Sequence, residues 1–90
     1  MGDSEVVFIT RMRELLANNI VYWRLERNLS QEELAYLLHS STQYISDIEN
    51  AKRNVACDFM DRLVKVLEIS PSELFIPRIL TKKRVRRNKN

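Results

Sequence analysis

The sequence predicts a small all-α domain, and three observations lead to this prediction. The 90-residue chain has a single glycine, at position 2, and two prolines, at positions 71 and 77, so few residues would interrupt a helix. Apolar side chains recur at intervals of three or four residues along most of the chain. No segment alternates apolar and polar residues over the length of a strand. With 44% hydrophobic and 30% charged residues, the composition is that of one globular domain.

The helical spacing divides the chain into six expected helices. They are placed near residues 4–17, 19–27, 31–38, 42–50, 57–68 and 71–76. The pattern fits both one continuous helix through residues 18 and 19 and a break between these two asparagines. Trp23 falls on the same apolar stripe as Ile20, which predicts that its ring lies in the core rather than on a binding surface.

Polar residues mark several expected helix ends. Ser30 and Glu33 have the spacing of a capping box, in which each side chain accepts a hydrogen bond from the other residue's backbone N–H. Ser41 is expected to cap the helix that follows it. Residues 70–73 repeat the capping-box pattern, with a proline at the first helical position. Asn28 is expected to end the preceding helix in the left-handed conformation, which asparagine tolerates.

Several classes of protein are not expected from this composition. The chain has one cysteine, Cys57, and one histidine, His39, which exclude a disulfide framework and leave too few ligands for a structural zinc site. It has neither a glycine-rich phosphate loop nor a nucleophile–base pair, so we expect no enzyme activity, no cofactor and no metal. The longest apolar run has four residues (6–9), and no leader-like segment opens the chain. We therefore expect a cytoplasmic protein without a membrane span.

The charges are divided unevenly along the chain. Residues 1–77 hold eight Lys and Arg against twelve Asp and Glu, a net charge of −4, whereas residues 78–90 hold seven cations and no acid. Blocks of like charge are commonly disordered and often contact polyanions. We expect residues 78–90 to be a basic flexible tail, either a solvated segment or an arm for DNA. The cations that would form this arm are Lys82, Lys83, Arg84, Arg86 and Arg87.

Two of the expected helices have the spacing of a DNA-reading motif. Only three residues separate the helices at 31–38 and 42–50, and so short a joint favours a steep crossing over an antiparallel pair. The second helix has apolar Ile45 and Ile48 on one face. The opposite face carries the short hydrogen-bonding residues Thr42, Gln43, Ser46 and Asp47. Short polar side chains near a helix N-terminus suit the reading of base edges in a major groove.

These segments together are similar to a known family. Residues 29–35, 44–50, 63–67 and 70–75 resemble the phage-repressor/Cro-type (XRE) helix-turn-helix family, and the resemblance runs from about residue 20 to residue 75. It implies a compact five-helix DNA-binding domain, commonly dimeric, that regulates transcription. With this resemblance, we expect an N-terminal amphipathic helical extension at residues 1–18, the DNA-binding domain at 19–77 and the basic tail at 78–90.

The resemblance also implies roles for individual residues. The expected DNA contacts within the domain are Gln31, Ser41, Thr42, Gln43, Tyr44, Ser46, Asp47, Asn50, Lys52 and Arg53. For Tyr44, packing is an equal alternative to a DNA contact. Asp47 can accept a hydrogen bond from a cytosine or brace Arg53. Arg24 and Glu49 match a partly buried ion pair with a structural role. His39 stands where the family often has glycine, which predicts left-handed backbone at this position or strain in the turn. Ala51 also replaces a frequent glycine of the family, just before Lys52 and Arg53.

Apolar residues near the end of the chain indicate an interface. Phe75, Ile76, Ile79 and Leu80 are expected to form a homodimer contact, with intramolecular packing as the alternative. Residues 8–16 provide a second candidate dimer surface. A two-fold dimer would read a near-palindromic operator. A rival interpretation keeps the fold but makes it an antitoxin or other protein-binding module. The expected partners are therefore double-stranded DNA, a second copy of the chain and, for the rival interpretation, a toxin or other regulator.

Overall fold

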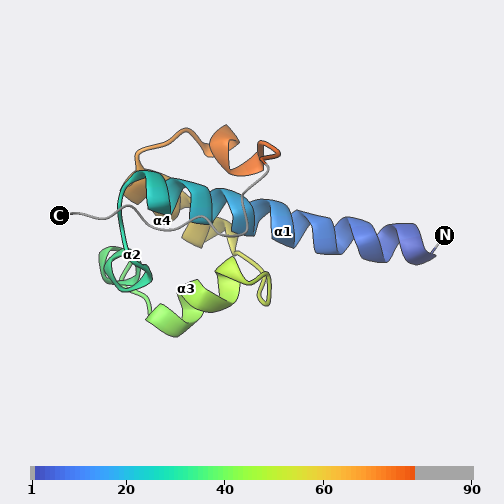
Figure 1. Ribbon diagram of the computed structural model, residues 1–90, viewed down its shortest axis with the longest axis horizontal. Coiled ribbons are helices and arrows are strands. Elements are labelled where there is room, and N and C mark those ends of the chain that lie inside the picture. The colour runs from blue at the N-terminus through green and yellow to red at the C-terminus, as the bar shows by residue number, and fades with distance from the viewer. Residues whose placement is uncertain (1, 79–90) are drawn as a thin grey trace.

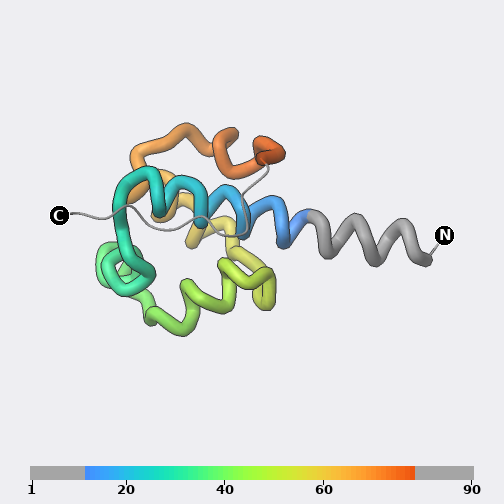
Figure 2. Tube along the Cα trace, in the orientation of Figure 1, coloured from blue at the N-terminus to red at the C-terminus, as the bar shows by residue number. Residues whose placement is uncertain are grey.

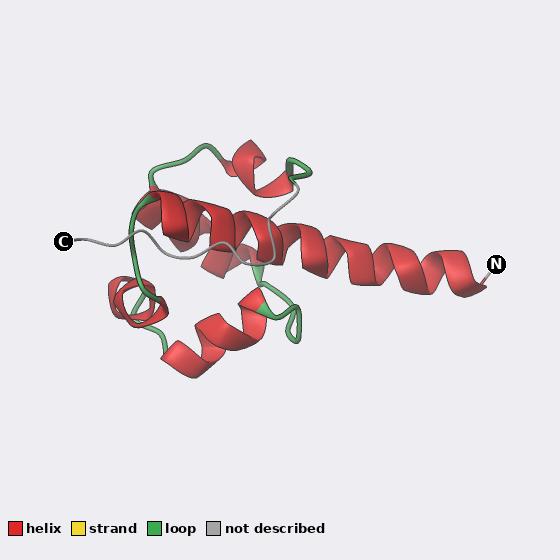
Figure 3. Cartoon of the chain, in the orientation of Figure 1, coloured by secondary structure: helices red, strands yellow, loops and turns green. Residues whose placement is uncertain are grey.

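The computed structural model describes the backbone of residues 2–78 and the side chains of residues 12–78. This part of the chain is all-α and has no strand, as the sequence predicts (Figures 1 and 3). Its elements are the helices α1 (Gly2–Glu26), α2 (Gln31–Leu37), α3 (Thr42–Glu49) and α4 (Cys57–Leu67) and the 3-10 helix η1 (Pro71–Phe75). The other elements gather around the C-terminal half of α1 (Figure 2). The expected fifth helix of the domain is thus the short η1.

The first helix is continuous, which decides between the two alternatives for residues 18 and 19. Asn19 lies within α1 and is fully buried. Its Nδ2 donates to the carbonyl oxygen of Leu74 over 2.6 Å, so the polar side chain is satisfied inside the core. Leu16 and Ala17 are buried as well. The expected boundary between an extension and the domain at residue 18 therefore falls inside a helix that already contributes to the core.

One hydrophobic core joins all five elements. Its buried members are Leu16, Ile20, Leu34, Ala35, Leu38, Ile45, Ile48, Phe59, Leu63, Leu67 and Leu74. Trp23 packs against this cluster and is partly buried, with its ring edge-to-face against that of Tyr22 at 5.2 Å between centroids. The inward orientation expected for Ile45 and Ile48 is confirmed, because each is only 1% exposed. Burial of this apolar surface is the main stabilising term of so small a domain.

Side-chain caps fix the starts of α2 and α3. Ser30 Oγ accepts from the backbone N–H of Glu33 at 3.0 Å, and Glu33 Oε1 accepts from the backbone N–H of Ser30 at 2.7 Å. The expected capping box is therefore present. Ser41 Oγ accepts from the backbone N–H of Tyr44 at 3.0 Å, which confirms the expected cap of α3. Each cap satisfies a backbone N–H that has no partner within its own helix.

The second expected capping box is wrong. Ser70 precedes η1 but makes no side-chain hydrogen bond to the backbone of this helix. Its hydroxyl instead lies 2.9 Å from that of Ser72. The backbone N–H of Glu73 donates to the carbonyl oxygen of Ser70 at 3.0 Å, and the carboxylate of Glu73 binds the guanidinium of Arg78 at 2.5 Å. Pro71 does occupy the start of the element, as expected.

Four residues other than glycine adopt positive φ angles. They are Asn28 (57°), His39 (55°), Ala51 (58°) and Glu68 (58°). Each stands just after a helix or at its C-terminal cap, where a left-handed residue reverses the chain. The left-handed conformation expected at Asn28 and His39 is present, and Ala51 shares it. A side chain with a Cβ adopts this conformation at a cost of about 1–2 kcal/mol, so the fold holds these turns against local preference.

Arg78 belongs with the folded domain and not with the basic tail. Its guanidinium donates to the side-chain oxygen of Asn19, to the carbonyl oxygen of Glu73 at 2.9 Å and to the carboxylate of Glu73. The same group lies over the rings of Tyr22 and Trp23, at 4.5 and 5.4 Å from their centroids. Arg78 therefore packs against the domain, although the expected tail begins with this residue. The remaining tail residues, 79–90, lie outside the described part of the chain.

Candidate nucleic-acid interface

The arrangement of α2 and α3 exposes one face of α3. In Figure 1, α2 is seen nearly end-on while α3 runs across the view, so the two helices cross steeply. The joint between them turns through His39 in the left-handed conformation. Arg62 from α4 donates to the carbonyl oxygen of Leu38 at 3.0 Å and so holds the end of α2. With Ile45 and Ile48 buried, the opposite face of α3 is directed to solvent.

The exposed face of α3 begins with short polar side chains. Ser41, Thr42 and Gln43 are exposed, and Ser46 and Asp47 are partly exposed. Tyr44 differs from them because its ring packs edge-to-face on Phe59, at 5.1 Å between centroids. The Tyr44 ring thus packs within the domain, and its contact with DNA stays a prediction. Hydrogen-bonding groups of this size, without a large charged residue among them, can reach base edges at close range.

Gln43, Asp47 and Arg53 form a polar network on this face. Gln43 Nε2 donates to Asp47 Oδ1 at 2.8 Å, and Arg53 Nε lies 3.6 Å from Asp47 Oδ2. The Arg53 guanidinium also lies 5.3 Å from the centroid of the Tyr44 ring. Asp47 therefore does brace Arg53, which was one of its two expected roles. The sequence did not indicate its bond to Gln43.

A second network anchors α3 to the rest of the domain. Arg24 donates to both carboxylate oxygens of Glu49, from Nε at 2.6 Å and from Nη2 at 3.0 Å. The two side chains are only 11% and 5% exposed, so the expected ion pair is present and nearly buried. Gln31 Nε2 also donates to Glu49 Oε1 at 2.9 Å, and Arg24 Nη1 donates to the carbonyl oxygen of Leu29 at 2.8 Å. The network thereby fixes α1, α2 and α3 to one another.

The loop after α3 adds cations to the same side of the molecule. Asn50 Nδ2 donates to the carbonyl oxygen of Ser46 at 2.9 Å and holds the end of α3. Lys52 and Arg53 follow it and are exposed. Arg13 from α1 donates to Asn54 Oδ1 at 3.0 Å, which places a further cation beside this loop. Sequence reasoning missed Arg13 and Asn54, because they are 41 positions apart and no local pattern relates them.

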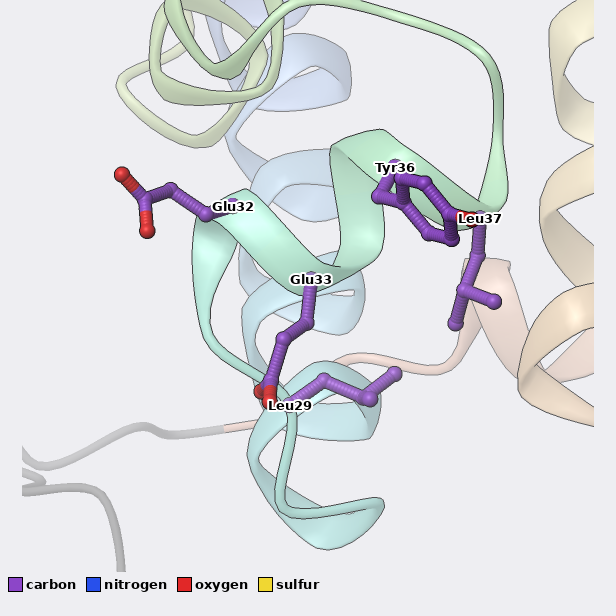
Figure 4. Close-up of a pocket in the computed structure, with 5 residues that line it drawn as sticks. All are labelled: Leu29, Glu32, Glu33, Tyr36 and Leu37. Carbon is purple, nitrogen blue, oxygen red and sulfur yellow. The ribbon is translucent and has the colours of Figure 1, made fainter.

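Another surface of α2 is apolar with an acidic edge. A shallow hollow there is lined by Leu29, Glu32, Glu33, Tyr36 and Leu37 (Figure 4). Tyr36 is 81% exposed and Leu37 is 45% exposed. These residues lie on a different face of α2 from Leu34 and Ala35, which are buried against the core. The hollow does not include any of the expected DNA-contacting residues.

The described residues offer neither a metal centre nor a membrane span. No group of three or more His, Cys, Asp or Glu side chains in this part of the chain could hold a metal ion. None of its helices combines the length and the apolar character that crossing a membrane requires. Cys57 is exposed and has a free thiol.

Comparison with known proteins identifies the family. The sequence profile of the helix-turn-helix family matches residues 20–74. Control protein C.SmaI from Serratia marcescens is 34% identical over 82 residues, which are 91% of this chain and 90% of that protein. Control protein C.BamHI from Bacillus amyloliquefaciens is 38% identical over 64 residues, 70% of this chain and 79% of that protein. The crystal structure of the restriction-modification controller protein C.AhdI from Aeromonas hydrophila has a TM-score of 0.67 and 32% identity, and the match covers 70% of this chain and 96% of that one.

These matches agree with the geometry of α2 and α3. The profile spans both helices and the turn between them, and the similar proteins are named as control or controller proteins. They favour DNA binding over the rival interpretation of the fold as a protein-binding module. The chain therefore belongs to the helix-turn-helix family and is a DNA-binding transcriptional regulator.

Proposed function

We propose that this protein is a controller-type regulator that binds a near-palindromic operator as a homodimer, with α3 in the major groove of each half-site. The observation that carries the proposal is the exposed polar face of α3, which the Arg24–Glu49 pair holds rigidly against α1. The names of C.SmaI, C.BamHI and C.AhdI as control or controller proteins support the controller type.

The first turn of α3 supplies the base-reading groups. Thr42 and Gln43 are exposed at the N-terminal end of the helix, which is the end that enters the groove in helix-turn-helix proteins. A glutamine amide pairs with the two hydrogen-bonding positions of adenine, and a threonine methyl group contacts the methyl group of thymine. Ser41 and Ser46 lie beside them and are within reach of bases or sugar-phosphate.

Other side chains around α3 position this helix on the DNA backbone. Lys52 and Arg53 are exposed in the loop after α3, and Asn50 caps the end of the helix beside them. Gln31 lies at the N-terminus of α2, and its amide nitrogen is bound to Glu49. The side chain is thereby held in place at the helix end where we expect it to contact phosphate. Contacts of this kind with phosphate set register and orientation but carry no sequence information.

The dimer forms through the apolar residues that follow α4. Phe75 and Ile76 are adjacent and are 45% and 39% exposed, so they present apolar surface that a second copy could cover. A two-fold axis through this surface would present two copies of α3 to half-sites about 34–36 Å apart, one turn of DNA. Ile79 and Leu80, which are also assigned to this contact, lie outside the described residues.

The basic residues of the tail, Lys82, Lys83, Arg84, Arg86 and Arg87, provide attraction for any DNA sequence. The preceding 77 residues carry a net charge of −4, so the tail is the main source of long-range attraction. Deletion of residues 81–90 is expected to weaken binding to all duplexes alike. It should reduce the slope of log affinity against log salt by about one for each phosphate that the shortened chain no longer neutralises.

Fluorescence anisotropy tests the proposal directly. The full chain is titrated with the DNA immediately upstream of its own coding region and with a scrambled duplex of the same composition, at several salt concentrations. We expect a preference for the upstream DNA that persists near physiological salt and is lost in Gln43→Ala. The matched control is Tyr36→Ala, which removes an exposed side chain from α2 and should leave the preference intact. Equal binding to both duplexes that vanishes with salt would contradict the proposal.

A further inference from the structure

Asp47 makes two different contacts on the exposed face of α3. Its Oδ1 accepts from Gln43 Nε2 at 2.8 Å, and its Oδ2 lies 3.6 Å from Arg53 Nε. Gln43 is one helical turn before Asp47 on α3, whereas Arg53 comes from the loop after the helix. One carboxylate therefore links a base-reading side chain to a phosphate-contacting one, within the interface described above.

The contact with Gln43 restricts how the amide is presented. The two ends of a glutamine amide differ, since the nitrogen donates and the oxygen accepts, whereas a carboxylate only accepts. Rotation of the amide by 180° would place its oxygen against Asp47 Oδ1, so only one orientation is compatible with the contact. The nitrogen retains a second N–H, and the oxygen remains available to a base.

The order of donor and acceptor determines which base edge fits. Adenine presents an acceptor, N7, beside a donor, N6, in the major groove, and the other bases present different orders. A glutamine amide that can rotate presents its donor and acceptor to the base in either order. A glutamine amide that is held by a carboxylate presents them in only one order. Asp47 thereby selects the base edge that Gln43 can read, without itself needing to contact that base.

The contact with Arg53 acts on the sequence-independent part of binding. The side chain of Arg53 is 57% exposed, but it is restrained by Asp47 and by its position over the Tyr44 ring. Tyr44 is in turn fixed by Phe59. A cation that is released toward phosphate raises the affinity for every sequence equally. By pairing with Arg53, and by repelling phosphate itself, Asp47 lowers the affinity for operator and non-cognate DNA alike.

We propose that Asp47 is a specificity-determining positioning residue, which orients the amide of Gln43 and restrains Arg53. The proposal rests on the proposed function, because both effects concern DNA bound to α3. The first effect raises the ratio of operator affinity to non-specific affinity through base discrimination. The second lowers the affinity for every duplex and leaves this ratio unchanged.

Asp47→Asn provides the test, because it keeps the size of the side chain but allows either amide orientation at Gln43 and removes the charge that faces Arg53. The full chain is titrated with the upstream DNA, with four versions of it that vary the base read by Gln43, and with the scrambled duplex. We expect discrimination among the four bases to fall about tenfold, as the loss of one good base-reading interaction implies. Affinity for the scrambled duplex should rise, with a salt slope steeper by about one.

Three further variants separate this role from simpler ones. Asp61→Asn makes the same change of charge at an exposed site on α4 and should alter neither base discrimination nor the salt slope. In an Arg53→Gln background, Asp47→Asn should still relax base discrimination but should no longer steepen the salt slope. Asp47→Glu keeps the charge on a longer arm and provides a second variant in which discrimination should fall, should Asp47→Asn not fold.

Three outcomes would overturn the inference. Unchanged discrimination in a folded Asp47→Asn would exclude the orienting role, and an unchanged salt slope would exclude the restraint on Arg53. Equal weakening on all duplexes would show that Asp47 acts only on the stability of α3. In each of these cases the wild-type protein still prefers its upstream DNA. Failure of the wild type to prefer it would instead remove the proposed function, and the inference with it.

Discussion

Arg24 and Glu49 form a nearly buried ion pair in which the guanidinium donates to both oxygens of the carboxylate, at 2.6 and 3.0 Å. The pair joins the long helix α1 to the last turn of α3, and Gln31 of α2 donates to the same carboxylate. It therefore connects the core of the domain to the helix that we assign to the major groove. Loss of this pair would affect both stability and the position of α3.

We expect Arg24→Met to destabilise the protein by about 3–5 kcal/mol, because it leaves the carboxylate of Glu49 buried and without its cation. The double variant Arg24→Met/Glu49→Leu removes both charges and should recover much of that loss. Urea unfolding, followed by circular dichroism at one protein concentration, measures the free energies. A double variant that is no more stable than Arg24→Met would contradict this explanation.

Ser30 and Ser70 provide a matched pair for the energetics of helix capping. Ser30 accepts from the backbone at the start of α2, whereas Ser70 makes no side-chain cap at the start of η1. Ser30→Ala should therefore cost about 1 kcal/mol, and Ser70→Ala should be nearly neutral. Thermal and urea unfolding of the two variants compare the costs. Equal losses would mean that the capping hydrogen bond contributes little to the stability of α2.

The difference between these two serines shows how far local sequence signals determine this fold. The box at Ser30 and Glu33 involves residues three positions apart, so a short pattern predicts it correctly. The pattern at Ser70 has the same spacing and fails: the backbone N–H of Glu73 donates to the carbonyl oxygen of Ser70, and the Glu73 carboxylate binds Arg78. A competing contact from elsewhere in the chain is invisible to such a pattern.

Long-range contacts explain the remaining differences in the fold. Two consecutive asparagines resemble a helix break, yet α1 continues through them because Asn19 is satisfied by the carbonyl of Leu74, 55 positions away. At the interface, the polar face of α3 and the pair of Arg24 and Glu49 could be expected from the family resemblance. The bond of Gln43 to Asp47 depends on side-chain rotamers, which periodicity does not specify.

Ala51→Gly is expected to stabilise the protein by about 0.5–1 kcal/mol. Ala51 has a φ of 58°, which glycine adopts without the steric cost of a Cβ, although glycine also raises the entropy of the unfolded chain. The control is Lys65→Gly, an exposed position within α4 where the same residue should be destabilising. Urea unfolding gives both values. A loss of stability in Ala51→Gly would show that the steric cost of the positive φ at Ala51 is smaller than the entropy that glycine adds to the unfolded chain.

Arg78→Met is expected to cost about 1–3 kcal/mol, since the buried side-chain oxygen of Asn19 would have no donor to satisfy it. The variant also removes the ion pair with Glu73 and the cation over the rings of Tyr22 and Trp23. Lys65→Met removes a cation from an exposed part of α4 and should change stability by less than about 0.5 kcal/mol. Trp23 fluorescence during urea unfolding provides the readout, and equal effects of the two variants would argue against a stabilising role for Arg78.

Phe75→Ser is expected to dissociate the proposed homodimer, because it replaces a 45% exposed aromatic ring at the proposed interface by a small polar group. Leu37→Ser is the matched control, since Leu37 is also 45% exposed but lies on α2, beside the acidic hollow. Sedimentation equilibrium measures the oligomeric state of each variant. We expect a monomer for Phe75→Ser and an unchanged dimer for Leu37→Ser. The opposite result would place the dimer contact on α2, and the spacing of the two copies of α3 would then have to differ from one turn of DNA.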